Sequence, residues 1–403
     1  MGNAIHSTIE KFLNSHNFSL EVEGLEHLDS LQPIAAGSAK LGAVQEGKKI
    51  IVIDAGGTNF RSCLVEKKGS KTIISDFEKT SMPAVHEELS KHDFYYQIAK
   101  NILRLKDKAD TIAFCFSYAI EFENGDAKIL RFSKEVKAPQ AVGTYVCQEL
   151  KFELIAQGWA PSIKINVLND TAALLLSGCM PGENKWGGQI AFILGTGMNS
   201  AYIEISQIVV TECGMFNDVV QSDVDKIVDK NSSCPGKSIL EKMCSGAYIG
   251  EIAYQMLLLA CKENQLSKQF AAELPNCAGM NAADFDAFFN QDKNEASSTS
   301  VLKKAANLGS ENDRQIIHML LQNLIERAAY ICAQAIITAI SHADLADDYS
   351  PICITCNGST FWKTPLLKET VQFYLNKKLD RRFEIVQIED DITTGSFVSA
   401  FIE

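Results

Sequence analysis

The sequence predicts an α/β protein made of two similar lobes, each with a mixed β-sheet flanked by helices. The apolar run at residues 49–54 (KIIVID) is typical of a buried strand, and a glycine turn at 56–59 connects it to a second strand at 62–65. The same order returns far downstream, where a strand at 189–194 is followed by the turn 195–199 and another strand. Because one plan occurs twice in a chain of 403 residues, we expect two lobes of related topology.

The first half continues as a three-strand meander, because the turn at 68–70 is followed by another strand-like segment. Amphipathic spacing predicts a helix at 87–105. The further elements expected here are a strand at 72–77, a strand ending at Leu168 and a helix at 171–178.

The second half is predicted to be richer in helix. Apolar residues recur at helical spacing from 313 to 342, and Ser310 followed by Asp313 resembles a capping box at the start of that helix. The polar stretch 262–308 is expected to contain mobile loops. The other predicted elements are strands at 201–205, 208–211 and 352–356, a long helix at 240–259 and a helix from about 365.

Composition indicates a globular protein that binds neither nucleic acid nor membrane. Hydrophobic residues make up 46% and charged residues 22%, and the net charge of -12 disfavours binding to nucleic-acid phosphates or anionic lipid heads. No apolar run approaches the roughly 20 residues that span a bilayer. Many of the 12 cysteines lie in apolar company, and the first residues lack the pattern of a secretory signal. We therefore expect reduced thiols and a cytoplasmic location.

The first glycine turn carries more chemistry than a hairpin needs. Its polar and glycine residues are Asp54, Gly56, Gly57, Thr58, Asn59 and Arg61. A strand follows it instead of a helix, which excludes a Walker loop or a dinucleotide fingerprint. Glycine permits a phosphate to approach the backbone, a carboxylate can hold a hydrated magnesium ion, and a guanidinium can face the transferring charge. An ordinary tight hairpin is the alternative for this turn taken alone.

The segment Asn169-Asp170-Thr171 precedes an apolar helix and admits two interpretations. Asp or Asn before such a helix is the commonest signal for a helix start. A carboxylate held at a helix start also stays ionised and rigid, so Asp170 is a candidate base that accepts the proton of a hydroxyl group. The two roles are compatible.

Other polar residues are candidates for sugar binding. Ser117, Ser133 and Lys134 combine short hydroxyl groups with a cation that can close on a sugar and on a migrating phosphoryl group. Glu212 and Glu241 can accept hydrogen bonds from sugar hydroxyls, although most glutamates lie on wet surfaces.

Two more turns offer backbone amides to phosphate oxygens. Gly195 and Thr196 belong to the second glycine turn. Residues 357–360 (NGST), which include Gly358 and Ser359, follow a strand and precede a helix, so their amides can receive a nucleotide phosphate. A plain loop is the alternative for this turn.

Taken in order, these motifs resemble those of the hexokinase family. The matching segments are 54–61 (first phosphate motif), 116–118 with 133–134 (sugar motif), 168–171 (connecting motif), 195–199 (second phosphate motif), 225–251, 327–329 and 358–359 (adenosine turn). The resemblance covers roughly residues 47–401. Each motif is short, but their order and spacing together are specific.

The resemblance implies an actin-like, ribonuclease H-like fold. The small lobe would hold residues 47–168 and 391–403, and the large lobe residues 1–46 and 169–390. The implied reaction transfers the γ-phosphoryl group of ATP to the 6-hydroxyl of glucose or a related hexose, the first step of glycolysis. Cleft closure would exclude water. The implied partners are ATP, Mg²⁺ and a hexose, bound by a monomer or a homodimer.

The resemblance also implies a role for each motif residue. Asp170 would be the general base, and Lys134 and Arg61 would be catalytic with it. The residues that would bind the hexose are Ser117, Ser133, Lys134, Asn169, Asp170, Asn199, Glu212 and Glu241. The residues that would bind the nucleotide are Asp54, Gly56, Gly57, Thr58, Asn59, Arg61, Gly195, Thr196, Gly358 and Ser359, with Asp54 also near Mg²⁺ through water.

Some positions depart from the family pattern, and two other functions would use the same cleft. Ala119 stands where the family usually has Pro, and Asn357 stands where its nucleotide turn begins with Asp. A sugar sensor without catalysis would not need the base that Asp170 offers. An actin-like ATPase without a sugar substrate would not need Glu212 and Glu241.

Overall fold

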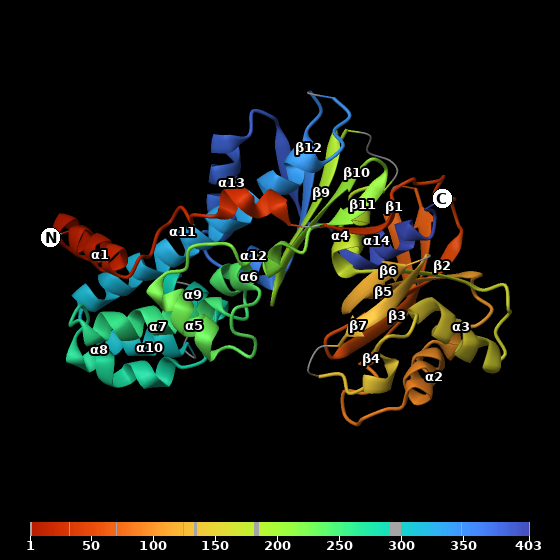
Figure 1. The fold of residues 1–403 in the computed structure, drawn as a ribbon, viewed down its shortest axis with the longest axis horizontal. Helices are drawn as coiled ribbons and strands as arrows, with labels where there is room; N and C mark the ends of the chain where they lie inside the picture. Colours follow the sequence, from red (N-terminus) through yellow and green to blue (C-terminus); the bar gives the residue numbers. More distant parts are fainter. Residues whose placement is uncertain are drawn as a thin grey trace.

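The computed structural model shows two lobes lying side by side (Figure 1). The residues that it describes are 2–31, 33–69, 71–123, 125–132, 135–180, 185–290, 300–347 and 349–402. Each lobe contains one mixed β-sheet with helices against it. The two-lobe α/β fold predicted from the repeated hairpins is therefore confirmed.

The sheet of the small lobe begins with the meander that the first glycine turn predicts. β2, β3 and β4 run antiparallel, and β5 and then β8 add in parallel on the other side of β2. The strands are β2 Lys49–Gly56, β3 Asn59–Lys68, β4 Lys71–Ser81, β5 Thr111–Phe116 and β8 Lys164–Leu168, in the order β4-β3-β2-β5-β8. β2 and β5 lie at the centre and are mostly buried, which explains their continuous apolar sequences.

The sheet of the large lobe repeats this plan. β9, β10 and β11 form an antiparallel meander, β12 and β13 follow β9 in parallel, and β1 pairs antiparallel with β11. The strands are β1 Ile34–Ser38, β9 Gly188–Leu194, β10 Met198–Glu204, β11 Gln207–Val210, β12 Ile352–Asn357 and β13 Phe383–Val386, in the order β1-β11-β10-β9-β12-β13. Both glycine turns thus connect neighbouring antiparallel strands, as predicted.

A two-stranded hairpin follows β5 and lies against β1 of the other lobe. It consists of β6 Ala119–Glu123 and β7 Asp126–Arg131, with Ala119 opposite Arg131. Ala127 and Ile129 are fully buried, whereas the last two residues of β7 are exposed. The end of this hairpin therefore presents side chains to the space between the lobes.

Two helices pack between the sheets and join the lobes. α4 Asp170–Ser177 lies against β9, and α14 Asp391–Ser399 lies against β2, while the two helices also pack on each other. A Cβ on Gly395 of α14 would lie only 1.7 Å from the carbonyl oxygen of Ala173 in α4, so this close crossing requires glycine. α2 Lys91–Asn101 and α3 Val146–Ala156 cover the opposite face of the small-lobe sheet.

The large lobe contains most of the helices. Besides α4 they are α1 Gly2–Ser15, α5 Asp223–Asn231, α6 Ile239–Cys244, α7 Ile249–Lys262, α8 Lys268–Glu273, α9 Ala282–Phe289, α10 Val301–Leu308, α11 Glu311–His342, α12 Ser359–Lys363 and α13 Leu367–Lys378. The predicted capping box of α11 is present, because Ser310 and Asp313 bond reciprocally to each other's backbone amides. By length and composition α11 is long and apolar enough to cross a membrane, but 67% of its most apolar window is buried inside the protein. It is the central core helix of this lobe.

Two sequence expectations about helix bounds need correction. The helix predicted at 240–259 is two helices, because the backbone of Gly246 and Ala247 leaves the helical path to donate hydrogen bonds to the carbonyls of Gly195 and Thr196. The stretch 262–308, expected to contain mobile loops, forms α8, α9 and α10 in its described part, with Phe270 and other apolar side chains buried, and its residues 291–299 lie outside the described residues. The helix expected to begin at 87 begins after Ser90, which caps it.

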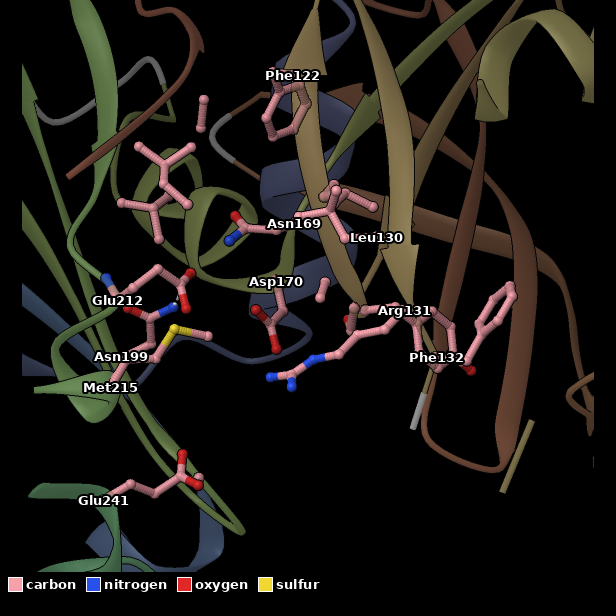
Figure 2. A pocket seen from close by; sticks show the side chains of 18 residues that line it. Phe122, Leu130, Arg131, Phe132, Asn169, Asp170, Asn199, Glu212, Met215 and Glu241 are labelled. Carbon is pink, nitrogen blue, oxygen red and sulfur yellow. Dashed lines mark hydrogen bonds between the residues drawn. The ribbon is translucent and has the colours of Figure 1, made fainter. Parts of the chain in front are cut away.

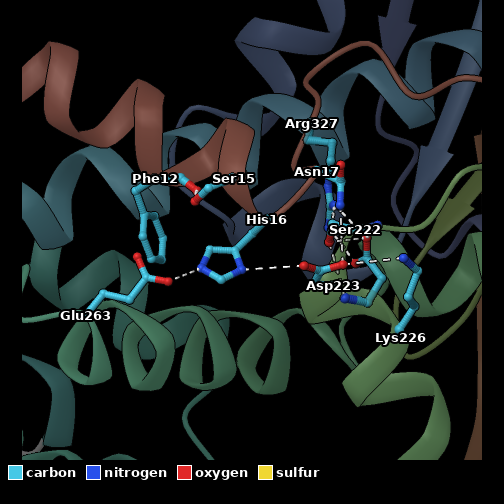
Figure 3. A network of polar contacts seen from close by, with 10 residues as sticks. Phe12, Ser15, His16, Asn17, Ser222, Asp223, Lys226, Glu263 and Arg327 are labelled. Carbon is cyan, nitrogen blue, oxygen red and sulfur yellow. Dashed lines mark hydrogen bonds and ion pairs between the residues drawn. The ribbon is translucent and has the colours of Figure 1, made fainter.

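A network of polar contacts fastens α1 to the large lobe (Figure 3). His16 follows α1 and approaches Glu263 at 2.7 Å and Asp223 at 3.5 Å. Next to it, Arg327 of α11 makes a bidentate pair with Asp225 of α5, with N–O distances of 2.7 and 2.8 Å. These contacts hold α5 against α11, and α5 in turn packs on α6.

Candidate functional site

A cavity of about 620 Å³ between the lobes collects the predicted sugar-binding residues (Figure 2). The predicted residues that line it are Ser117, Asn169, Asp170, Asn199, Glu212 and Glu241. They come from the loop after β5, the start of α4, β10, the segment after β11, and α6. The fold therefore brings together residues that are far apart in the sequence. Ser133 and Lys134 lie outside the described residues.

Asp170 is the first residue of α4, and Asn169 is its N-cap. The side chain of Asn169 accepts a hydrogen bond from the amide of Ala172 at 2.7 Å, which fixes the start of the helix. Oδ1 of Asp170 accepts hydrogen bonds from the amide and hydroxyl of Thr171, at 2.7 and 3.2 Å. Burial raises the pKa of Asp170, although the contacts with Thr171 act in the opposite direction. Figure 2 shows its carboxylate directed into the cavity.

Glu212 faces the cavity from a left-handed backbone conformation, with φ of 52°. Its carboxylate accepts a hydrogen bond from the amide of Asn199 at 2.9 Å, and its own backbone N–H donates to Asn199 at 3.0 Å. Burial raises the pKa of Glu212, and the negative charge of Asp170 raises it further. Positive φ in a residue other than glycine carries strain and occurs often at functional sites.

Glu241 lies on α6 and accepts a hydrogen bond from the backbone N–H of Met198 at 3.2 Å. A Cβ on Gly197 would come within 2.6 Å of this carboxylate, so glycine in the second turn leaves room for it. Burial raises the pKa of Glu241, and the charge of Glu212 contributes in the same direction. No cation within the described residues makes a salt bridge to any of the three cavity carboxylates, and all three have raised pKa values.

The first glycine turn contacts Ser117 and Tyr118, and Ser117 lines the cavity. A Cβ on Gly56 would lie 2.9 Å from Cβ of Ser117, and the hydroxyl of Tyr118 donates to the carbonyl of Gly57 at 3.0 Å. Gly57 has φ of 56°, which favours glycine. Thr58 and Asn59 complete the turn. The predicted phosphate hairpin therefore lies next to one wall of the cavity.

Asp54 and Arg61 lie opposite each other on β2 and β3 and form an ion pair at 2.5 Å. Burial raises the pKa of Asp54, while Arg61 acts in the opposite direction. Within the described residues no group of three or more His, Cys, Asp or Glu side chains is arranged to hold a metal ion. The single carboxylate of Asp54 fits Mg²⁺, because this ion keeps several waters and takes few carboxylates from the protein.

The second phosphate turn and the adenosine turn pack backbone against backbone. A Cβ on Gly358 would lie 2.1 Å from the carbonyl oxygen of Leu194, and Gly358 has φ of 112°. The hydroxyl of Thr360 donates to the carbonyl of Gly195 at 2.9 Å. Thr196 accepts from Ala247, and Ser359 begins α12. These contacts place the two turns side by side.

Sequence reasoning missed several residues at this site. Arg131 lines the cavity from the end of β7, and the only local signal is its position two residues before the predicted sugar residue Ser133. Asp391, at the start of α14, accepts a hydrogen bond from the side-chain amide of Asn357 at 2.5 Å. Burial raises the pKa of Asp391, and the charge of Asp54 adds to this. A carboxylate thus stands beside the turn that begins with Asn357, but no signal near position 357 indicates it.

Comparisons with known proteins identify the family of this chain. Two sequence models of the hexokinase family match the chain, one over residues 4–180 and the other over residues 189–402. Hexokinase from Plasmodium falciparum is 25% identical over 447 residues, covering 98% of this chain and 89% of that protein. Glucokinase-1 from Kluyveromyces lactis is 26% identical, covering 78% and 76%. The match to hexokinase-1 from Pongo abelii covers 59% of this chain and 28% of that longer protein.

Solved structures show the same fold. Hexokinase from Schistosoma mansoni in complex with glucose superposes with a TM-score of 0.76 at 21% identity, covering 99% of each chain. Another hexokinase crystal structure gives a TM-score of 0.77 at 18% identity. The repeated hairpins, the two sheets and the sequence matches lead to one conclusion, which is that this chain belongs to the hexokinase family of hexose phosphotransferases.

Proposed function

We propose that this enzyme transfers the γ-phosphoryl group of ATP to the 6-hydroxyl of glucose or a closely related hexose, with Asp170 as the general base. The observation that carries the proposal is the meeting of Asp170 with Glu212 and Glu241 in one cavity. Both glycine turns flank this cavity, since Gly56 approaches Ser117 and Gly197 is part of the lining.

The environment of Asp170 suits a base. Thr171 holds Oδ1, so the other carboxylate oxygen has no hydrogen-bond partner among the described residues and is free to accept a proton from a sugar hydroxyl. A pKa above the ordinary range makes the carboxylate a better proton acceptor near neutral pH. The helix start fixes its direction, and positioning is most of what phosphoryl transfer requires from a protein.

The remaining carboxylates suit hexose recognition. A carboxylate only accepts hydrogen bonds, and each sugar hydroxyl has one proton to donate. Glu212 and Glu241 are held in place by Asn199 and by the backbone of Met198. A hexose that satisfies these acceptors would relieve the cost of burying them without a salt-bridge partner.

The nucleotide would bind across the three turns. Backbone amides near Gly57, Thr196 and Ser359 would hold its phosphates. Arg61 would neutralise charge on the transferring group. Bound Mg²⁺ supplies charge neutralisation between the phosphates, and Asp54 would hold its water shell.

Glucose is the first hexose to test, because the similar hexokinase from Schistosoma mansoni was solved with glucose bound. The decisive variant is Asp170→Asn, which keeps the shape of the side chain but removes its capacity as a base. We expect kcat to fall by about 100-fold or more, in line with general-base contributions. ADP release in the presence of ATP, Mg²⁺ and glucose measures it.

A matched control is Asp93→Asn, which alters a carboxylate in the first turn of α2, outside the cavity. It should leave kcat unchanged. Calorimetry should show that Asp170→Asn still binds glucose. Wild-type activity persisting in Asp170→Asn would contradict the proposed base. Glucose binding without any ADP release by the wild type would favour a sensor.

A further inference from the structure

Arg131 occupies an unusual position for an arginine in this protein. It is the last residue of β7 and pairs across the hairpin with Ala119, which directly follows Ser117 and Tyr118. Figure 2 shows its side chain extending into the cavity toward Asp170. In the part of the chain that the structure describes, no hydrogen bond or ion pair engages its guanidinium. Its N–H groups are therefore not committed to any partner among the described residues.

The cavity is rich in acceptors and poor in donors. Asp170, Glu212 and Glu241 are acceptors only. Asn199 already donates to Glu212. A hexose also presents oxygen atoms that need donors, including a ring oxygen that can only accept. Among the lining residues that are described, Arg131 offers the largest unengaged set of N–H groups.

The charge of Arg131 acts on the cavity. It lowers the pKa of Glu212 and of Glu241, in opposition to their burial. It is the only cationic side chain among the described lining residues. Without it, the three carboxylates would have no positive charge among the described lining residues, which is unfavourable in a partly desolvated site.

We propose that Arg131 binds the hexose directly, donating hydrogen bonds to sugar oxygens on the side that faces the β6–β7 hairpin while Glu212 and Glu241 accept from hydroxyls on the other side. This inference rests on the proposed hexose site. The hairpin would then determine hexose affinity. Arg131 would select for sugars with an acceptor oxygen at the contacted position.

The experiment compares Arg131→Met and Arg131→Lys with the matched control Lys128→Met. Lys128 lies on the same strand and is not part of the cavity lining, so the control makes the same charge change outside the site. Calorimetry measures glucose binding and needs no turnover. We expect the Kd and KM for glucose to rise by about 10-fold or more in Arg131→Met, as for a lost hydrogen bond to a charged group.

Three further readouts separate binding from a structural effect. The KM for ATP should stay unchanged, because Arg131 lines the sugar cavity and does not belong to the three turns proposed for the nucleotide. Arg131→Lys should fall between wild type and Arg131→Met. Among deoxyglucose analogues, the one lacking the contacted oxygen should bind wild type and Arg131→Met with equal affinity.

Unchanged glucose affinity in Arg131→Met would overturn the inference, as would an equal loss in Lys128→Met. A fall in kcat with unchanged Kd would also contradict it, because Arg131 would then act on phosphoryl transfer. If the wild type binds glucose but releases no ADP, the proposed reaction fails. The binding comparison still decides the role of Arg131.

Discussion

Two clusters of charge in the same molecule show opposite designs. In the first, which we call the paired cluster, Arg327 and Asp225 make two short hydrogen bonds and are 1% and 2% exposed. Ser222 bonds to the same carboxylate, and the ring of Phe18 lies 3.9 Å from the guanidinium. Each charged oxygen in this cluster has a partner.

In the second, which we call the open cluster, Asp170, Glu212 and Glu241 share one cavity. Neutral groups hold part of each carboxylate, but no salt bridge within the described residues reaches any of them. Burial raises the pKa of all three.

The paired cluster is what a structural role requires, and the open cluster is what a binding role requires. A buried bidentate ion pair fixes neighbouring elements, and removing one partner leaves an uncompensated charge. Buried carboxylates without a salt-bridge partner cost stability in the empty protein, and a ligand that donates to them recovers part of that cost. Incomplete pairing in the open cluster therefore supports the proposal that a ligand binds there.

The largest expected effect comes from breaking the paired cluster. Arg327→Met should lower the free energy of unfolding by about 3–5 kcal/mol, because Asp225 would stay buried without its partner. Chemical denaturation measures this change. The double variant Arg327→Met with Asp225→Asn should be less destabilised than Arg327→Met alone, because no unpaired charge is left. Equal stability of wild type and Arg327→Met would remove the distinction between the two clusters.

A smaller effect of opposite sign is expected in the open cluster. Glu241→Gln removes a charge that has no cation partner but keeps an oxygen for the Met198 amide. We expect the unliganded protein to become more stable, while the KM for glucose rises by about 10-fold or more. Thermal unfolding without sugar and steady-state kinetics test the two parts. Glu251→Gln on α7, outside the cavity, should change neither.

The smallest effect is a pH dependence of that stabilisation. The folded-state pKa of Glu212 and of Glu241 is raised, so the folded protein binds their protons more readily than the unfolded chain does. Stability contributed by these groups therefore falls as pH rises through the raised values. The double variant Glu212→Gln with Glu241→Gln should exceed wild type in stability most at neutral pH. This advantage should vanish as pH falls toward the ordinary carboxyl pKa of about 4. An advantage that stays constant across this range would contradict the raised pKa values.

Local patterns were sufficient to predict the hairpins and most of the strands. The hairpin at Asp54 to Arg61 and the turn at Gly195 can be predicted, because glycine beside polar residues between two apolar runs is typical of a turn. The start of α11 was equally readable, since a capping box is a signal of four residues.

Features created by contacts between distant segments could not be read in this way. The helix break at Ser245 exists because the next two residues pair with the turn at Gly195, and apolar spacing continues across it. Asp391 reaches Asn357 only after α14 has packed between the lobes. Arg131 is one charged residue at a strand end, and only the folded cavity distinguishes it from a surface arginine.

The position of α14 (dark blue in Figure 1) has a consequence for how the protein is made. Phe397 and Val398 of this helix are fully buried in the same cluster as Val52 and Ala113 of the small-lobe sheet. During synthesis that face of the sheet lacks the cover of α14 until residues 391–399 have been made, long after β2 and β5. The small-lobe sheet is thus completed only after most of the large lobe has been synthesised, and in that interval part of its apolar face is open to chaperones.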